Sequence, residues 1–300
     1  MPFRRMISPT IRHMIMAPIE TKHMLTRALL ASLLLAATLP AQTASDQHRE
    51  FPAFKIAGNL YYVGTADLAV YLINTPEGNI LINSDFPKDV PLIKKSIASL
   101  GFRYADTKII LISHAHNDHD SAVGLIRSET GAKLMVMEGD AAEEESTAPG
   151  RPATHVDRVL HDGDTVELGG SKWVARLTPG HTKGCTTWTT RIHEGNRDLN
   201  VVIVGSPNIN AFALVNNKEY PQIAEDYVKG FAVLNALPCD LFLGAHGSYF
   251  GLMAKYDKFK AGDKNAFIDP AGYKAYIAER EKAFHEEWER QKKDPGSPKK

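Results

Sequence analysis

Three histidines and an aspartate fall within six consecutive residues of this 300-residue chain, in the segment HAHNDH that begins at His114. The residues just before it, 108–113, are apolar at their centre and predict a β-strand. Alternate residues of an extended segment point the same way, so His114 and His116 can face one point in space, while Asp118 and His119 fall in the following turn. Imidazole and carboxylate groups at this density are costly to bury without a cation. We therefore predict a metal site in this segment.

Two further histidines stand in similar surroundings. His181 and His246 each lie in a glycine-containing loop beyond a predicted strand, 173–177 and 240–244 respectively. Either residue alone could be an ordinary hydrogen-bonded loop histidine, but together with the hexapeptide they supply the donors that a pair of metal sites still needs. The other histidines lack such a setting and are interpreted as surface or core residues, including His155, His161, His193 and His285.

The composition excludes some classes of protein. With 43% hydrophobic residues, 300 residues are enough for one sizeable domain with a core. Lysine and arginine number 35 and aspartate and glutamate also number 35, so no broad basic surface is expected to hold nucleic acid. The only cysteines, Cys185 and Cys239, could form one bridge in an oxidising compartment, and the sequence does not decide whether they pair.

Residues 1–44 are predicted to be a signal peptide and an upstream segment. Basic residues such as Lys22 and Arg27 precede an apolar run, 28–39, and small and polar residues follow from Pro40. The run is shorter than the roughly 20 residues that span a bilayer, so a stable membrane anchor is the less favoured alternative. A signal peptide implies a periplasmic or secreted protein.

Both ends of the chain are expected to lie outside the fold. Residues 1–23 carry no structural pattern and Met24 stands where a signal peptide would begin, so Met24 is a candidate for the true start. The tail 292–300, rich in lysine, proline, glycine and serine, is predicted to be disordered. The catalytic domain is therefore expected to span 45–291.

Between these ends, short apolar strands alternate with helical patterns, which predicts an α/β (α+β) fold and not a helical bundle. Helices are expected where apolar residues recur at helical spacing, at 91–100, 121–129, 221–237 and 273–291. Strands are expected at short apolar runs bounded by turn residues, at 60–63, 69–73, 79–82, 108–113, 134–137, 165–168, 173–177, 186–192, 201–204 and 240–244.

The hexapeptide matches the HxHxDH signature in full, and the chain resembles the metallo-β-lactamase superfamily from about residue 50 to 290. The resemblance implies an αβ/βα sandwich with two zinc ions at one edge, between two sheets. It implies that the first zinc ion is bound by His114, His116 and His181. It implies that the second zinc ion is bound by Asp118, His119 and His246.

One further position separates members of this superfamily. After the strand that corresponds to 201–204, thioester hydrolases and lactonases usually carry a metal-bridging aspartate, and two β-lactamase subclasses carry a cysteine. This chain has Ser206, which resembles the third subclass of the class B β-lactamases. The segments 134–140 (LMVMEGD), 179–187 (PGHTKGCTT) and 237–240 (LPCD) resemble that subclass too.

The chain departs from the subclass at three positions. Lys183 stands where proline is frequent, and Asn208 stands where a second serine often helps to bind the substrate carboxylate. Tyr273 stands where some members carry a cysteine that pairs with one like Cys239. The resemblance therefore leaves the substrate profile open and removes that particular bridge.

The function implied by the resemblance is zinc-dependent hydrolysis of the β-lactam amide bond by a metal-bound hydroxide, in a protein expected to be a monomer. Asp118 would orient the nucleophile and provide a proton path, and the substrate carboxylate would be bound by Ser206, Asn208 and Lys183. The alternatives are a hydrolase of the same fold that acts on a lactone or a thioester, and a catalytically silent zinc-binding periplasmic module.

Overall fold

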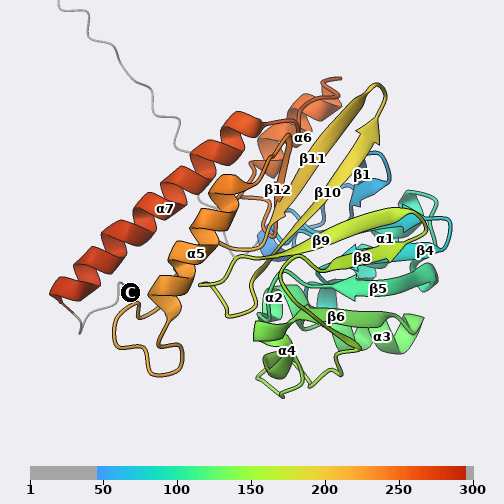
Figure 1. Ribbon diagram of the computed structural model, residues 1–300. Helices are drawn as coiled ribbons and strands as arrows, with labels where there is room; N and C mark the ends of the chain where they lie inside the picture. Colours follow the sequence, from blue (N-terminus) through green and yellow to red (C-terminus); the bar gives the residue numbers. More distant parts are fainter. Residues whose placement is uncertain (1–45, 295–300) are drawn as a thin grey trace, which may run out of the picture. The chain divides into compact units, whose positions relative to one another are not determined.

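The structure, a computed structural model, describes residues 46–294 (Figure 1). The predicted signal peptide and most of the predicted tail lie outside the described residues. Within 46–294, no helix is both long enough and apolar enough to cross a membrane.

The first of two sheets has seven strands in sequential order. The first four strands pair antiparallel, and β4 to β7 pair parallel. The strands are β1 (Phe54–Ala57), β2 (Leu60–Tyr62), β3 (Tyr71–Thr75), β4 (Gly78–Ile82), β5 (Thr107–Leu111), β6 (Lys133–Met137) and β7 (Arg158–Leu160).

The second sheet has five strands in the order β12-β11-β10-β9-β8. Only the β11–β12 pair is parallel, and the other pairs are antiparallel. The strands are β8 (Thr165–Leu168), β9 (Ser171–Leu177), β10 (Thr186–Glu194), β11 (Arg197–Val204) and β12 (Leu241–Gly244).

Helices cover the two sheets from outside. On the first sheet lie α1 (Val90–Ser99) and α3 (Val123–Thr130), while α5 (Ile223–Ala236) and α7 (Pro270–Lys293) pack together beside the second sheet (Figure 1). Three further helices are α2 (Asn117–Asp120), α4 (Glu138–Glu144) and α6 (Leu252–Lys260). The short 3-10 turns are η1 (Asp46–His48), η2 (Pro87–Asp89) and η3 (Tyr104–Asp106). The arrangement confirms the predicted α/β (α+β) class and the αβ/βα sandwich.

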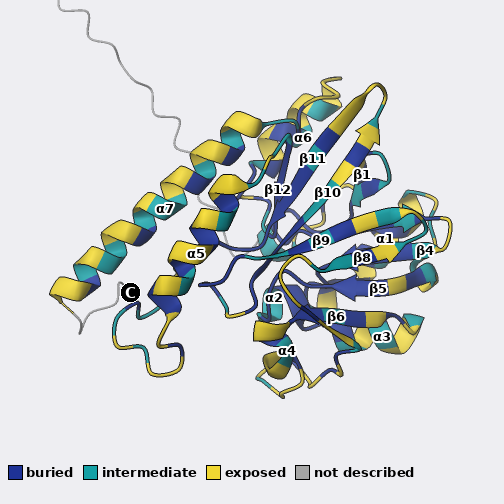
Figure 2. Ribbon diagram, viewed as in Figure 1, coloured by how far each residue is buried: buried dark blue, intermediate teal, exposed yellow. Residues whose placement is uncertain are grey.

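Strand β5 shows how the apolar runs build this sandwich. Ile109 and Leu111 belong to the core shared with the second sheet, whereas Ile110 and Ile112 belong to the core beneath α1 and α3. A strand buried on both faces needs an unbroken apolar run, which is the pattern that the sequence shows. Each such side chain contributes about 1.5–3 kcal/mol through burial. Figure 2 shows the buried interior of both sheets beneath exposed helix surfaces.

Some elements were not predicted. Strands β1 and β7 are short and lie at the two edges of the first sheet, where few apolar residues are required. Helix α4 buries Asp140 and Glu144 in place of an apolar stripe, so hydrophobic spacing gave no signal for it. Helix α7 continues to Lys293, so the first two residues of the predicted tail are helical.

Candidate metal centre

The loops that carry the predicted ligands all follow strands. His114 comes shortly after β5, His181 after β9 and His246 after β12, while Ser206 follows β11. Parallel pairing places the ends of β11 and β12 side by side. The fold thus gathers loops that are more than 60 residues apart in sequence, as the 65-residue separation of His116 and His181 shows.

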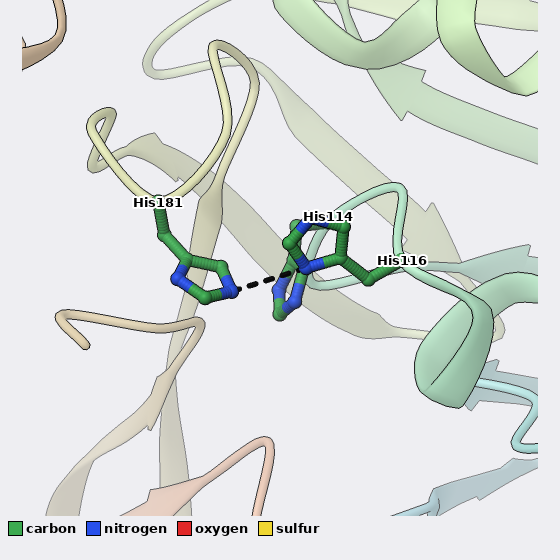
Figure 3. Close-up of side chains that lie close together, drawn as sticks. All are labelled: His114, His116 and His181. Carbon is green, nitrogen blue, oxygen red and sulfur yellow. Dashed lines mark hydrogen bonds between the residues drawn. The ribbon is translucent and has the colours of Figure 1, made fainter. Parts of the chain in front are cut away.

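His114, His116 and His181 form one cluster (Figure 3). Their candidate donor atoms all lie within 4.8 Å of one another. The His181 Nε2 atom lies 3.1 Å from His116 Nδ1, and the ring centroids of His114 and His181 are 4.5 Å apart. The structure therefore brings together the three residues predicted for the first ion.

Asp118, His119 and His246 lie beside this cluster. The Asp118 Oδ2 atom is 3.4 Å from His119 Nε2 and also 3.4 Å from His246 Nε2. The donor atoms of His114, Asp118 and His119 also lie within 4.8 Å of one another, so the two clusters adjoin at His114. All six predicted ligands therefore converge on one region.

The turn that presents His181 requires glycine at position 180. Gly180 has a φ of +128°, and a Cβ there would lie 2.5 Å from Cγ of Tyr227. Any other residue would meet both backbone strain and this ring. The close packing of α5 against the loop fixes where His181 points.

The buried donors fit a cation. Among the described residues, His114 Nδ1 and both ring nitrogens of His119 are buried without a hydrogen-bond partner. An unpaired buried polar atom is costly, so these nitrogens fit ligand positions better than core positions. Imidazole nitrogens together with a carboxylate form a donor set typical of zinc.

Electrostatics keep most of these imidazoles neutral, the form that binds metal. Burial lowers the pKa of His119 to about 4 and that of His181 to about 3, and the neighbouring rings add to the effect at His181. Burial and four neighbouring imidazoles also hold the pKa of His114 well below its usual range. The pKa of His116 is lowered mainly by burial.

His246 and Asp118 behave differently because they pair with each other. Burial alone would lower the pKa of His246, but hydrogen bonds to Asp118 and Asp67 raise it to about 9. Burial opposes ionisation of Asp118, yet the His119 and His246 rings hold its pKa far below the usual range. Without metal, the site therefore carries a charged His246–Asp118 pair.

Sequence reasoning missed the residues that support the ligands. Asp67 Oδ2 lies 3.2 Å from His246 Nδ1, and the backbone carbonyl of Asn208 lies 2.7 Å from His181 Nδ1. Partners of this kind fix the ring orientation and leave the other nitrogen free for a metal. Asp67 lies 179 residues before His246, so no local spacing could reveal the pair.

Asp140 joins two ligand loops. Its buried carboxylate accepts hydrogen bonds from the backbone N–H groups of Ala115 and Gly184, at 3.0 and 2.7 Å, and from the Thr182 hydroxyl at 2.7 Å. One carboxylate thereby ties the loop of His114 and His116 to the loop of His181. The segment 134–140, which contains Asp140, resembles the third β-lactamase subclass, but this likeness does not predict that Asp140 connects the two loops.

Two of the three residues predicted to bind substrate are connected through one tyrosine, and the third is exposed. Tyr249 connects Ser206 and Asn208, because its hydroxyl lies 3.1 Å from Ser206 Oγ and accepts a hydrogen bond from Asn208 Nδ2 at 3.0 Å. Arg280 Nη1 donates to Asn208 Oδ1 at 3.4 Å. Lys183 is exposed, and its ammonium lies 5.5 Å from the centre of the Tyr220 ring.

A hollow in another part of the described chain is lined by other residues. Its volume is about 670 Å³, and its polar lining includes Lys172, Arg176 and Arg191 but none of the six predicted ligands. The size of this hollow does not by itself indicate a chemical function. The six converging donors mark the functional site better than the hollow does.

Comparisons with known proteins agree with this geometry. The family model described as the metallo-beta-lactamase superfamily matches residues 68–194. The native FEZ-1 metallo-beta-lactamase from Legionella gormanii is 48% identical, with a TM-score of 0.80 over 81% of this chain and 98% of that chain. The class B3 di-zinc metallo-beta-lactamase LRA-12 from an Alaskan soil metagenome is 34% identical, with a TM-score of 0.77 over 82% of this chain and 98% of that chain.

Curated sequences give a partial match. A hydroxyacylglutathione hydrolase from Fuscovulum blasticum is 35% identical over 100 residues, which is 33% of this chain and 34% of that protein. The chain thus spans about a third of the length of the curated relatives that it matches.

The chain belongs to the metallo-β-lactamase superfamily, a family of metal-dependent hydrolases. Within it, the chain is most similar to the class B3 metallo-β-lactamases, as Ser206 had indicated. The predicted family and the predicted enzyme class are both confirmed.

Proposed function

We propose that the protein hydrolyses the β-lactam amide bond with two zinc ions held by the six converging residues. His114, His116 and His181 would hold one ion, and Asp118, His119 and His246 the other. The observation that carries the proposal is the convergence of these donors in a chain with Ser206, and not aspartate, after β11. The 48% identity to FEZ-1 over nearly all of that chain supports it.

Bound zinc would polarise the substrate carbonyl and lower the pKa of a bound water from about 15.7 towards 7. In the hydrolysis itself, the oxygen of water forms a bond to the carbonyl carbon and the carbon–nitrogen bond of the ring breaks. The nitrogen that leaves takes up a proton. Because the four-membered ring is strained, no covalent bond to the protein is needed.

Asp118 is proposed to handle the proton. Its Oδ2 atom lies between the Nε2 atoms of His119 and His246, at 3.4 Å from each. Its low pKa keeps it ionised at neutral pH, so its carboxylate can accept a hydrogen bond from the attacking water, take up the proton that this water releases and deliver it to the departing nitrogen.

Ser206 and Asn208 are proposed to bind the substrate carboxylate. Tyr249 links their side chains, and the Arg280 guanidinium places a positive charge beside the amide oxygen of Asn208. Lys183 is proposed to contribute charge from the exposed loop, although its ammonium lies against Tyr220 in the structure. The signal peptide predicted for residues 1–44 supports a periplasmic or secreted location for this activity.

A second candidate is hydrolysis of a thioester or a lactone. The 35% identity to a hydroxyacylglutathione hydrolase over about a third of that protein favours it. The serine at position 206 supports the β-lactam proposal instead, since a metal-bridging carboxylate is missing there.

The test is to present zinc-loaded protein with a penicillin, a cephalosporin, a carbapenem, a lactone and a glutathione thioester. We expect ring opening of at least one β-lactam, abolished by a chelator, at a rate well above that for the lactone or thioester. Turnover of the thioester alone would establish the second candidate. Stoichiometric zinc uptake without turnover of any compound would identify a catalytically silent zinc-binding module.

A further inference from the structure

A second group of metal-binding side chains lies outside the six residues described above. It consists of His48 in η1, Asp85 just after β4 and Asp89 in η2. Their candidate donor atoms all lie within 4.8 Å of one another, and His48 Nδ1 is 2.8 Å from Asp89 Oδ2.

The two carboxylates are unusually deep for surface acids. Asp85 is 0% exposed and Asp89 is 3% exposed. Asp85 Oδ1 accepts a hydrogen bond from the backbone N–H of Phe86 at 2.8 Å, but Asp85 Oδ2 is buried without a hydrogen-bond partner. A buried carboxylate oxygen without a donor carries a desolvation cost that a bound cation would remove.

The charges around the group are unbalanced. Burial raises the pKa of Asp85 to about 9, and the negative charge of Asp89, a proton shared with its carboxylate and the charge of Asp118 add to the effect. Among the salt bridges of residues 46–294, Asp89 pairs with His48, and Asp85 pairs with no basic side chain. A divalent cation would displace this proton and stabilise both carboxylates in their ionised form.

The group also has a structural connection to the main metal loop. The backbone carbonyl of Asp85 accepts a hydrogen bond from Ala122 at 3.1 Å, and the Ser84 N–H donates to the His119 carbonyl at 2.9 Å. An ion held by the group would therefore tie the N-terminal turn at His48 to the segment that supports the ligand loop.

We propose that His48, Asp85 and Asp89 form a third divalent-cation site, selective for zinc-like ions and distinct from the two-ion centre. One imidazole and two carboxylates suit zinc better than magnesium or calcium, which favour all-oxygen sites. Zinc–ligand bonds of about 2.0–2.2 Å place neighbouring donors about 3.3 Å apart, so small side-chain rotations would complete the site.

The first test counts metal. Chelated protein is dialysed against Zn²⁺, and the zinc bound per chain is measured by atomic emission for the wild type, His48→Ala and His116→Ala. We expect His48→Ala to bind one ion fewer than the wild type while keeping its hydrolytic rate within about twofold. His116→Ala should lose both an ion and hydrolysis. Equal zinc content in the wild type and His48→Ala would overturn the proposal.

The second test does not depend on any enzymatic activity. In Asp85→Asn, the amide can donate to Asp89, so the chelated variant should melt at or above the temperature of the chelated wild type. Added Zn²⁺ should then raise the melting temperature of the wild type by more than that of the variant. Ca²⁺ and Mg²⁺ should not reproduce the difference. An identical zinc response in both proteins would show that the group is only a carboxylate pair that shares a proton.

Both tests compare a variant with the wild type, so they do not require the main centre to act on β-lactams. If the proposed hydrolysis fails but His48→Ala still binds one ion fewer, the third site remains supported. If hydrolysis is found and the zinc counts do not differ, only the third site is rejected.

Discussion

At the scale of single residues, Asp140 determines whether the ligand loops hold together. Its carboxylate accepts three hydrogen bonds, from Ala115, Gly184 and Thr182. In Asp140→Asn, the amide nitrogen would face N–H donors, and each buried donor left without an acceptor costs about 1–3 kcal/mol.

We therefore expect Asp140→Asn to lower the unfolding free energy by a few kcal/mol and to weaken zinc binding by roughly tenfold or more. Urea unfolding of the chelated protein and competition with a zinc indicator measure the two effects. Asp198→Asn, which changes an exposed carboxylate on β10's partner strand, is the matched control. An Asp140→Asn variant with wild-type zinc affinity would contradict the role assigned to this residue.

The predicted ligands and their supporting residues differ in how far the sequence reveals them. His114, His116, Asp118 and His119 are visible because local spacing packs four donors into six residues. Asp67 and Tyr249 are not visible, because their contacts depend on how distant loops meet. For the same reason, no local pattern predicts that Tyr249 connects Ser206 to Asn208.

At the scale of elements, a buried ion-pair network fixes α2 against α4. Arg151 is 2% exposed, and its guanidinium pairs with Asp120 and Glu144 while donating to Glu143. Burial raises the pKa of both Asp120 and Glu144, and the guanidinium opposes that rise. Since α2 carries Asp118 and His119, the network helps to set their position.

Removing the central charge should leave buried acids without a partner. Arg151→Met is expected to lower the unfolding free energy by about 3–5 kcal/mol, whereas Arg151→Lys, which keeps the charge, should lose less. Denaturant unfolding of the two variants beside the wild type measures the difference. If Arg151→Met unfolds at the wild-type denaturant concentration, the network does not hold these helices.

The elements themselves were largely predictable where burial demands a pattern. Strand 165–168 was predicted with its observed bounds, and the run that became β5 was found within two residues at each end. For β11 the predicted run 201–204 covers only the second half of the strand. The polar α4 and the short edge strands β1 and β7 were missed, since tertiary contacts and not apolar spacing hold them in place. Helix α2 was expected only as a turn.

At the scale of the whole molecule, the buried imidazoles make the metal-free fold sensitive to pH. Histidines 119 and 181 have pKa values of about 4 and about 3 in the fold, below the value of about 6.5 in an unfolded chain. The unfolded chain therefore binds more protons below pH 6.5, and stability is lost as the pH falls towards 4. His246 acts in the opposite direction, because its stabilisation is complete below about pH 6.5 and is lost as the pH rises from there through its pKa of about 9 in the fold.

The chelated protein should therefore be most stable near about pH 6.5, with a loss of several kcal/mol by about pH 4 and a smaller loss as the pH rises from 6.5 to 9. Urea unfolding across pH 4 to 10 in the presence of a chelator measures this profile. A flat stability between pH 4 and 6.5 would mean that the imidazoles are not buried as the structure shows.

The most direct test of the central claim is the rate of penicillin hydrolysis as zinc is returned to chelated protein. We predict no hydrolysis before zinc is added, recovery as zinc fills the six-residue centre, and a rate at least about 100-fold lower for His116→Ala. His155→Ala, which changes a histidine whose side chain is 74% exposed, should recover like the wild type. Hydrolysis that persists without zinc, or a His116→Ala variant with the wild-type rate, would contradict the account.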